Sequence, residues 1–235
     1  KYIGKREHAP SCPLLKMPTP SKTEMLERGV GHGEFRPGQE AVIDVLLGGR
    51  NALALFPTGG GKSLCYQLPA LLFDGLTLVV SPLIALMKDQ VETLQSKGIE
   101  AARLDSTLEP SEINRIYDAM EDGSLKLLYV APERLANEGF LRRLRRTPIE
   151  MMAVDEAHCI SEWGHNFRPD YLKLAALAKD LKIPRILALT ATATPRVAEQ
   201  IRERFSIAEA DRIQTGFSRP NLTFEVHPCS ESCLL

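Results

Sequence analysis

Short apolar runs recur along the chain, and most of them lack an alternation of apolar and polar residues. Such alternation marks a strand with one face in water, whereas a continuous apolar run is typical of a strand buried on both faces. We therefore predict buried strands at Ala52 to Phe56, Leu76 to Ser81, Ala101 to Leu104, Leu127 to Ala131, Met151 to Asp155 and Ile186 to Thr190.

Longer amphipathic segments lie between these runs. They predict helices at Lys62 to Phe73, Leu83 to Lys97, Pro110 to Glu121, Asp170 to Leu181 and Pro195 to Phe205. Strands that alternate with helices favour right-handed crossover connections. The fold class is therefore predicted as α/β, with a mostly parallel sheet and helices on both faces.

The N-terminal part follows a different pattern. Residues 1–20 are rich in proline without an apolar period, which indicates a flexible lead. Ser21 with Glu24 has the form of a capping box and predicts a short helix that ends at Gly29. Pro37 is predicted to be the first residue of a further helix, closed by Gly48 and Gly49.

Composition narrows the functional classes. The 235 residues carry a net charge of -1, so no overall positive field indicates nucleic acid, and such a partner would need a local surface. No apolar stretch is long enough to span a membrane, and no secretory signal is readable at the start of the chain. Five scattered cysteines suit reduced thiols, and Cys229 with Cys233 lacks two of the ligands that zinc needs.

A glycine-rich turn follows the first predicted strand: Pro57, Thr58, Gly59, Gly60, Gly61, Lys62 and Ser63. Between a strand and a helix, such a turn directs backbone N–H groups and the helix N-terminus at one anion. The strict phosphate-loop pattern would need glycine where Phe56 stands, but the shorter Thr-Gly-Gly-Gly-Lys-Ser form is present. We predict that Lys62 reaches the β and γ phosphates and that Ser63 is a Mg²⁺ ligand. An ordinary glycine turn is the disfavoured alternative.

Two carboxylates, Asp155 and Glu156, stand at the end of another predicted strand. Ligands collect at the carboxyl ends of strands in open α/β sheets, so this pair is expected beside the glycine-rich turn. Asp155 is predicted to hold Mg²⁺ directly or through water, and Glu156 to orient the attacking water. Without the turn, a solvated acidic loop would be the better interpretation.

Seven ordered segments give the chain, from about Met25 to Phe224, a close resemblance to the first RecA-like lobe of RecQ-type superfamily 2 DNA helicases. The segment from Trp163 to Pro169 favours this family over other helicases. The matching segments are Phe35 to Gln39, Pro57 to Ser63, Ser81 to Leu83 with Lys88 to Gln90, Ala131 to Arg134, Asp155 to His158, Cys159 to Pro169 and Thr190 to Ala193.

The resemblance implies how a nucleotide is held. Gln39 is expected to read the adenine edge with its amide, and Arg36 to stack on the ring. His32 stands where the family usually has tyrosine, and it can still stack on the ring with a smaller face. ATP and Mg²⁺ are the implied ligands.

The resemblance also implies a DNA-binding or coupling group. Aromatic rings such as Trp163 and Phe167 can stack on bases without sequence preference, although composition alone favours these two as core anchors. Arginines at positions 142, 143, 145 and 146 form either a further DNA contact or a solvated face. The implied DNA-binding and coupling residues are Ser81, Lys88, Gln90, His158, Trp163, His165, Phe167, Arg168, Thr190 and Thr192.

The implied function is the ATP-binding lobe of a 3′-to-5′ DNA helicase that acts on single-stranded and partly duplex DNA. The lobe is expected at residues 21–228 with a tail at 229–235, and a second RecA-like lobe is expected beyond it. Because that lobe would supply an arginine finger, the 235 residues alone are expected to hydrolyse ATP poorly. The expected location is cytoplasmic or nucleoid in a bacterium, or nuclear in a eukaryote, and the oligomeric state stays open.

Three other functions stay open at this point. A DEAD/DEAH-type RNA helicase shares the turn and the acidic motif, and the Trp163 to Pro169 segment argues against it. A small-molecule P-loop kinase would need an arginine-rich lid, which is not apparent. A non-catalytic module that binds DNA or a partner protein is the third.

Overall fold

The computed structural model describes residues 22–26, 33–161, 167–216 and 225. These residues form a single seven-stranded sheet in the order β3-β4-β2-β5-β6-β1-β7, and every strand pair is parallel. The strands are β1 (Ala52–Leu55), β2 (Leu76–Val80), β3 (Ala101–Leu104), β4 (Leu127–Val130), β5 (Ile149–Val154), β6 (Ile186–Thr190) and β7 (Arg212–Gln214).

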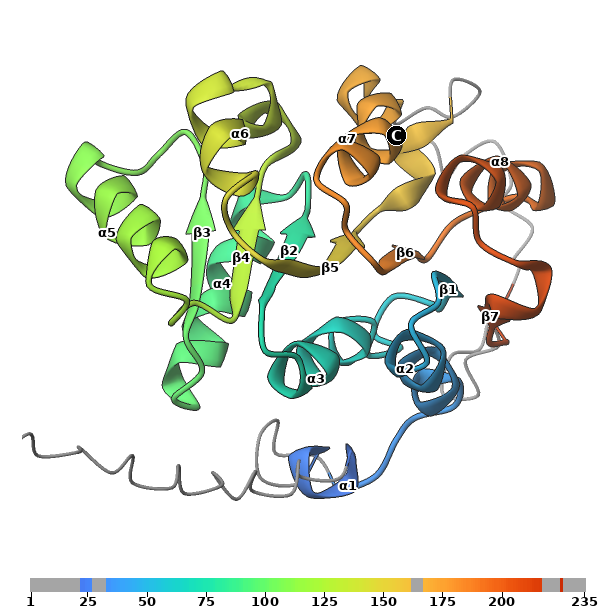
Figure 1. Cartoon of the computed structure of the whole chain (residues 1–235). Coiled ribbons are helices and arrows are strands. Elements are labelled where there is room, and N and C mark those ends of the chain that lie inside the picture. Colours follow the sequence, from blue (N-terminus) through green and yellow to red (C-terminus); the bar gives the residue numbers. More distant parts are fainter. Residues whose placement is uncertain (1–21, 27–32, 162–166, 217–224, 226–235) are drawn as a thin grey trace, which may run out of the picture.

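Helices cover both faces of this sheet (Figure 1). The α-helices are α1 (Lys22–Met25), α2 (Gln39–Leu47), α3 (Leu64–Leu72), α4 (Ile84–Ser96), α5 (Pro110–Glu121), α6 (Glu138–Leu144), α7 (Leu174–Asp180) and α8 (Pro195–Phe205). Short 3-10 helices are η2 (Pro132–Ala136), η3 (Ala157–Ile160), η4 (Pro169–Lys173) and η5 (Glu209–Asp211). The predicted α/β class is confirmed.

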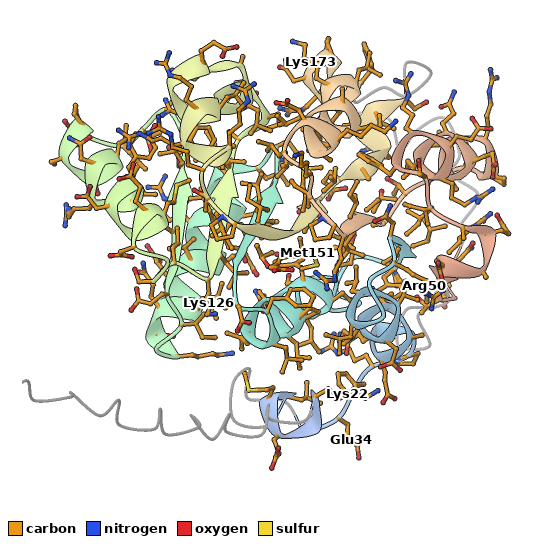
Figure 2. The ribbon with its side chains drawn as sticks, in the orientation of Figure 1. Lys22, Glu34, Arg50, Lys126, Met151 and Lys173 are labelled. Atoms are coloured by element: carbon orange, nitrogen blue, oxygen red, sulfur yellow. The ribbon has the colours of Figure 1, made fainter. Side chains whose placement is uncertain are left out.

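Strands β1, β2, β4 and β6 are fully buried, as their unbroken apolar runs predicted. The predicted buried strand β3 is only half-buried at Ala102 and Arg103, because it lies at the edge of the sheet. Helices α2, α3 and α4 pack on one face around Ala54, Val79 and Tyr129. Helices α5 to α8 pack on the other face around Leu78 and Val154. Figure 2 shows side chains filling the space between sheet and helices, with Met151 inside and Lys173 at the periphery.

Several predicted boundaries are corrected by backbone geometry. Pro37 is not helical, because Gly38 has a left-handed φ of 81° and α2 begins only at Gln39. Lys62 and Ser63 belong to the turn, and α3 begins at Leu64. The helix predicted at Asp170 to Leu181 divides into η4 and α7.

Two elements escaped the sequence analysis. The edge strand β7 has three residues and pairs with β1, and α6 has seven residues. Both are too short for their periodicity to stand out. Among the described residues, no helix is long and apolar enough to cross a bilayer.

Candidate functional site

The loops that follow β1, β2 and β5 meet at the carboxyl edge of the sheet. They enclose a cavity of about 320 Å³ between the glycine-rich turn and the acidic pair. β5 and β1 are separated only by β6, whose last residue accepts a backbone hydrogen bond from Phe56. The cavity is lined by Thr58, Gly59, Gly61, Lys62, Ser63, Tyr66, Ser81, Leu86, Met87, Gln90, Tyr129, Asp155 and Glu156.

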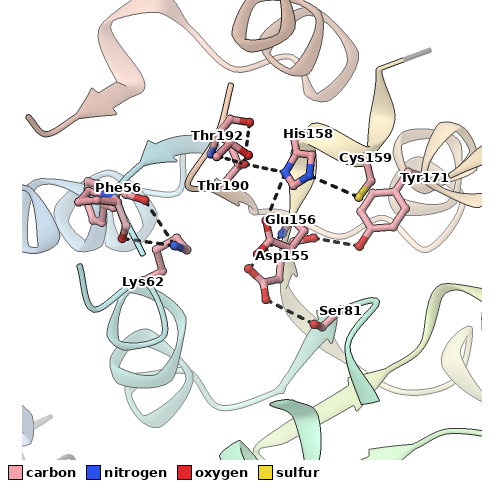
Figure 3. A network of polar contacts seen from close by, with 11 residues as sticks. Phe56, Lys62, Ser81, Asp155, Glu156, His158, Cys159, Tyr171, Thr190 and Thr192 are labelled. Carbon is pink, nitrogen blue, oxygen red and sulfur yellow. Dashed lines mark hydrogen bonds and ion pairs between the residues drawn. The ribbon is translucent and has the colours of Figure 1, made fainter. Parts of the chain in front are cut away.

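The glycine-rich turn is shaped by its glycines. Gly59 and Gly61 have left-handed φ values of 79° and 76°, which residues with a Cβ rarely adopt. Within the turn, Gly60 N–H donates to Pro57 O at 2.9 Å. The Lys62 ammonium donates to Phe56 O at 3.3 Å and to Pro57 O at 3.4 Å, so it lies folded against its own loop (Figure 3).

Gln39 holds this turn from α2. Its amide nitrogen donates to Gly61 O at 2.9 Å, and its amide oxygen accepts from Arg36 N at 2.7 Å. The Arg36 guanidinium in turn donates to Gly59 O. Gln39 is buried rather than solvent-facing, and its amide bonds the loop and the backbone of Arg36. A second hollow of about 230 Å³ adjoins these residues.

The acidic pair has an unusual backbone. Glu156 adopts a left-handed conformation with φ 48° and ψ 43°, which costs a non-glycine residue about 1 kcal/mol. Asp155 accepts from the Ser81 hydroxyl at 3.3 Å and from Glu156 N–H at 3.0 Å. Burial, and then repulsion from Glu156, raises the pKa of Asp155.

His158 connects the acidic pair to β6. Its Nδ1 lies 3.2 Å from Glu156 Oε2 and 2.9 Å from the Thr190 hydroxyl, which also donates to Thr192 O at 3.3 Å (Figure 3). The hydrogen bond from His158 lowers the pKa of Glu156. Contacts with the Cys159 sulfur and the Glu156 carboxylate raise the pKa of His158 to about 9. Glu156 and His158 are therefore an ion pair at neutral pH.

The oxygen atoms that line the cavity suit a hard cation that also binds phosphate oxygens. Ser63 and Asp155 supply a hydroxyl and a carboxylate, which are the oxygen donors that Mg²⁺ prefers. No cluster of three or more His, Cys, Asp or Glu ligands occurs among the described residues. A Mg²⁺ ion here would therefore take most of its ligands from phosphate and water, as is usual for this ion.

The residues with an implied role in DNA binding or coupling lie at different places in the fold. Ser81 is buried and bonds Asp155, while Gln90 accepts from Gln67 Nε2 at 2.8 Å, so both face the candidate nucleotide cavity rather than an outer surface. Lys88 is exposed, 3.8 Å from Glu92.

A separate hollow of about 440 Å³ receives other members of that group. It is lined by Thr58, Pro82, Leu83, Glu156, His158, Cys159, Phe167, Arg168, Ala191 and Thr192. Thr58 and Glu156 border both this hollow and the candidate nucleotide cavity. His32, Trp163 and His165 lie outside the described residues.

Two of the four arginines on and after α6 form surface ion pairs. Arg143 lies 2.6 Å from Glu121, and Arg145 lies 3.0 Å from Asp180. These pairs favour the interpretation of a solvated face over that of a DNA contact.

Three tyrosines at the site were missed by the sequence analysis. Tyr66 and Tyr129 line the candidate nucleotide cavity, and their hydroxyls lie 3.5 Å apart. The Tyr171 hydroxyl donates to the backbone oxygen of Asp155 at 3.0 Å. Tyr66 and Tyr129 lie in apolar stretches, where an aromatic residue is usually part of the core. Tyr171 lies in a polar segment whose sequence carries no sign of its contact with Asp155.

The chain is similar in sequence to known helicases. A family described as "DEAD/DEAH box helicase" matches residues 36–201. An ATP-dependent DNA helicase RecQ of Bacillus subtilis is 47% identical over 86% of this chain, and one of Haemophilus influenzae is 44% identical over 90%. The chain spans 34% and 35% of those two relatives, about a third of their length.

Solved structures agree on the fold. A hypothetical ATP-dependent RNA helicase from Sulfolobus tokodaii has a TM-score of 0.64 and 23% identity, covering 83% of this chain and 56% of that one. The DUF1998 helicase MrfA bound to DNA has a TM-score of 0.65 and 15% identity, covering 85% and 28%. The architecture is thus that of RecA-like helicase domains, and the chain belongs to the DEAD/DEAH box helicase family, with RecQ-type DNA helicases among its relatives over most of its length.

Proposed function

We propose that this chain is the ATP-binding lobe of a RecQ-like 3′-to-5′ DNA helicase, which couples hydrolysis of Mg-ATP to movement along single-stranded DNA. The observation that carries the proposal is the single cavity lined by Lys62 and Ser63 on one side and by Asp155 and Glu156 on the other. A cation, a hydroxyl and two carboxylates around one cavity are the groups that phosphoryl transfer to water requires.

Each group has a separate role. Lys62 leaves the carbonyls of its own loop and neutralises the β and γ phosphates, while Ser63 and Asp155 hold Mg²⁺. Mg²⁺, when bound, offsets phosphate charge. Glu156 orients the attacking water, and because its pKa is lowered it is ionised at neutral pH and accepts that hydrogen bond. Gln39 and Arg36 lie beside the adjoining hollow, which suits the base.

The named relatives favour DNA over RNA as the nucleic acid along which the protein moves. Those at 44–47% identity are named DNA helicases, whereas the likeness to an RNA helicase structure, at 23% identity, concerns the fold alone. The hollow beside Glu156 contains Phe167 and Arg168, a ring and a guanidinium that suit stacking on single-stranded bases. A second RecA-like lobe in the full-length protein is part of this proposal, since the chain spans about a third of its relatives.

The test uses the full-length protein that carries this chain. Lys62→Ala should weaken ATP binding and lower kcat at least ~100-fold, because it removes the charge that phosphate meets. Glu156→Gln should lower kcat comparably but keep ATP affinity, because a neutral amide cannot replace the ionised carboxylate that orients the attacking water. Lys173→Ala, at an exposed lysine paired with Asp170, is the matched control and should leave both unchanged.

Stimulation of the ATPase by single-stranded DNA but not by RNA would support the DNA assignment, and the reverse would favour the RNA helicase. A cellular role of the full-length protein that survives Lys62→Ala would contradict the motor function and favour a non-catalytic binding module.

A further inference from the structure

We propose that Tyr171 is a positioning residue for the acidic pair, because its hydroxyl fixes the peptide group between Asp155 and Glu156. The inference rests on the proposed function, since it assigns to Tyr171 a part in the geometry of that same site. Tyr171 lies in η4, sixteen residues beyond the carbonyl that it contacts, and does not line the nucleotide cavity.

The contact acts at the strained point of the site. The Tyr171 hydroxyl donates to Asp155 O at 3.0 Å, and that oxygen belongs to the peptide that leads into Glu156 (Figure 3). On the other side of the same peptide, Glu156 N–H donates to Asp155 Oδ1 at 3.0 Å. Both polar atoms of this one peptide group are therefore held, and its orientation sets ψ of Asp155 and φ of Glu156.

The backbone conformation of Glu156 requires contacts such as this hydrogen bond. Its φ of 48° lies in a region that non-glycine residues leave unless neighbouring contacts hold them there. If the peptide turned, the carboxylates of Asp155 and Glu156 would move relative to the cavity together. A single hydrogen bond from Tyr171 thus bears on both groups to which the proposed function assigns chemistry.

The environment makes the hydroxyl a dependable donor. The Tyr171 side chain is fully buried, and burial raises its pKa, so it stays protonated at any working pH. The titratable groups around it, which are Cys159, Asp155, Arg168 and Glu156, all belong to the site or its border. η4 is itself tied to η3, because Arg168 N–H donates to Cys159 O at 3.0 Å.

The experiment compares Tyr171→Phe with the wild type in the full-length protein. Phenylalanine keeps the buried ring and removes only the hydroxyl. We expect kcat to fall about 10-fold both with and without single-stranded DNA, with KM for ATP within about twofold, when turnover is normalised to nucleotide-binding sites. Amide exchange at Glu156 should accelerate while the amides of β5 keep their protection.

Tyr117→Phe is the matched control. That ring stacks on Phe140 with centroids 6.2 Å apart and lies under Arg143, far from the cavity lining, so kcat and KM should equal those of the wild type.

Two outcomes would overturn the proposal: an unchanged kcat, and a lower melting temperature with unchanged turnover per site. The second would show that the hydroxyl serves stability alone. A wild type without Lys62-dependent ATPase would reject the proposed function instead, whereas an active wild type with an unaffected Tyr171→Phe rejects only the positioning role.

Discussion

Glu156 lines the candidate nucleotide cavity, and its Oε2 lies 3.2 Å from Nδ1 of His158, an ion pair when the imidazole is protonated. Their side chains are 25% and 15% exposed, so water screens the pair less than a surface ion pair.

The left-handed backbone of Glu156 has no helix end to explain it. The other two described non-glycine residues with positive φ, Lys182 and Ser206, lie at the carboxyl ends of helices, where this conformation is common.

The ion pair predicts a pH-dependent stability. The folded-state pKa of His158 is raised from 6.5 to about 9, so its contribution is complete below about pH 6.5 and is lost as pH rises through about 9. Glu156, with a lowered pKa, contributes above its ordinary value of 4.5 and loses that contribution in acid. The wild type should therefore exceed His158→Gln in unfolding free energy by about 1–2 kcal/mol more at pH 6 than at pH 9.5.

Urea unfolding of both proteins at the two pH values measures this difference. The comparison cancels every other titration that the two chains share. A difference in stability that stayed constant from pH 6 to pH 9.5 would show that the ion pair contributes nothing.

At the residue scale, the sequence indicated the candidate site residues but not the long-range hydrogen bonds that these residues make. Lys62, Ser63, Asp155 and Glu156 could be found because their neighbours in sequence form recognisable turns and strand ends, although their individual roles stay predictions. The expectation that Gln39 reads the adenine edge stays a prediction, and the structure adds a hydrogen bond from its amide to the glycine-rich turn. That contact joins α2 to a turn twenty-two residues away, and no local pattern encodes it.

The glycine-rich turn and α2 behave as one unit through Gln39. A Cβ on Gly61 would overlap the Gln39 amide nitrogen, and the φ of 76° is itself unfavourable for alanine. Gly98 has a similar φ of 74° but open space around it.

Gly61→Ala should thus cost about 2–3 kcal/mol of unfolding free energy, against about 1 kcal/mol for Gly98→Ala. The excess reflects the two hydrogen bonds of Gln39, to Gly61 O and from Arg36 N, that break when its amide moves aside. Chemical denaturation of the two variants measures it. Equal losses would mean that the Gln39 contact adds no stability.

The edge strand β7 is fastened at its start by an ion pair. Asp211 is buried with 3% of its surface exposed, and Arg50, in the connection between α2 and β1, pairs with its carboxylate. Removal of the arginine leaves a buried carboxylate without its partner, which is costly.

Arg50→Ala should lower the unfolding free energy by about 2 kcal/mol. Arg145→Ala, which breaks an ion pair whose members are 44% and 51% exposed, should lower it by no more than about 0.5 kcal/mol. Urea titrations of the two variants make the comparison. Similar losses for both would mean that burial of Asp211 does not depend on Arg50.

Elements of ordinary length were predicted well. The bounds of β3, α5, β6 and α8 agree with the sequence analysis to the residue. Long amphipathic patterns define α5 and α8, and an unbroken apolar run defines β6. β7 was missed because three residues carry no pattern, and it exists only because β1 offers an unpaired edge. The start of α2 was misjudged because Gly38, not Pro37, decides where helical geometry begins.

For the whole molecule, the proposed function implies an incomplete motor. Measured alone, the 235 residues should bind ATP weakly and hydrolyse it ~10³-fold or more below the full-length rate, because an arginine finger from a second lobe is worth about that much. Unwinding should be absent. A steady-state ATPase assay of both proteins with single-stranded DNA makes the comparison, and robust stimulation of the 235 residues alone would contradict this expectation.

The sequence by itself determined the α/β class, the order of most elements and the two segments that line the candidate nucleotide cavity, because periodicity, glycine turns and strand ends are local properties. Only the tertiary structure decided that β6 lies between β1 and β5, that Ser81 and Gln90 face the cavity, and that Tyr171 reaches back to Asp155. These depend on which strands become neighbours, and strand order follows from packing of the whole sheet rather than from any one segment.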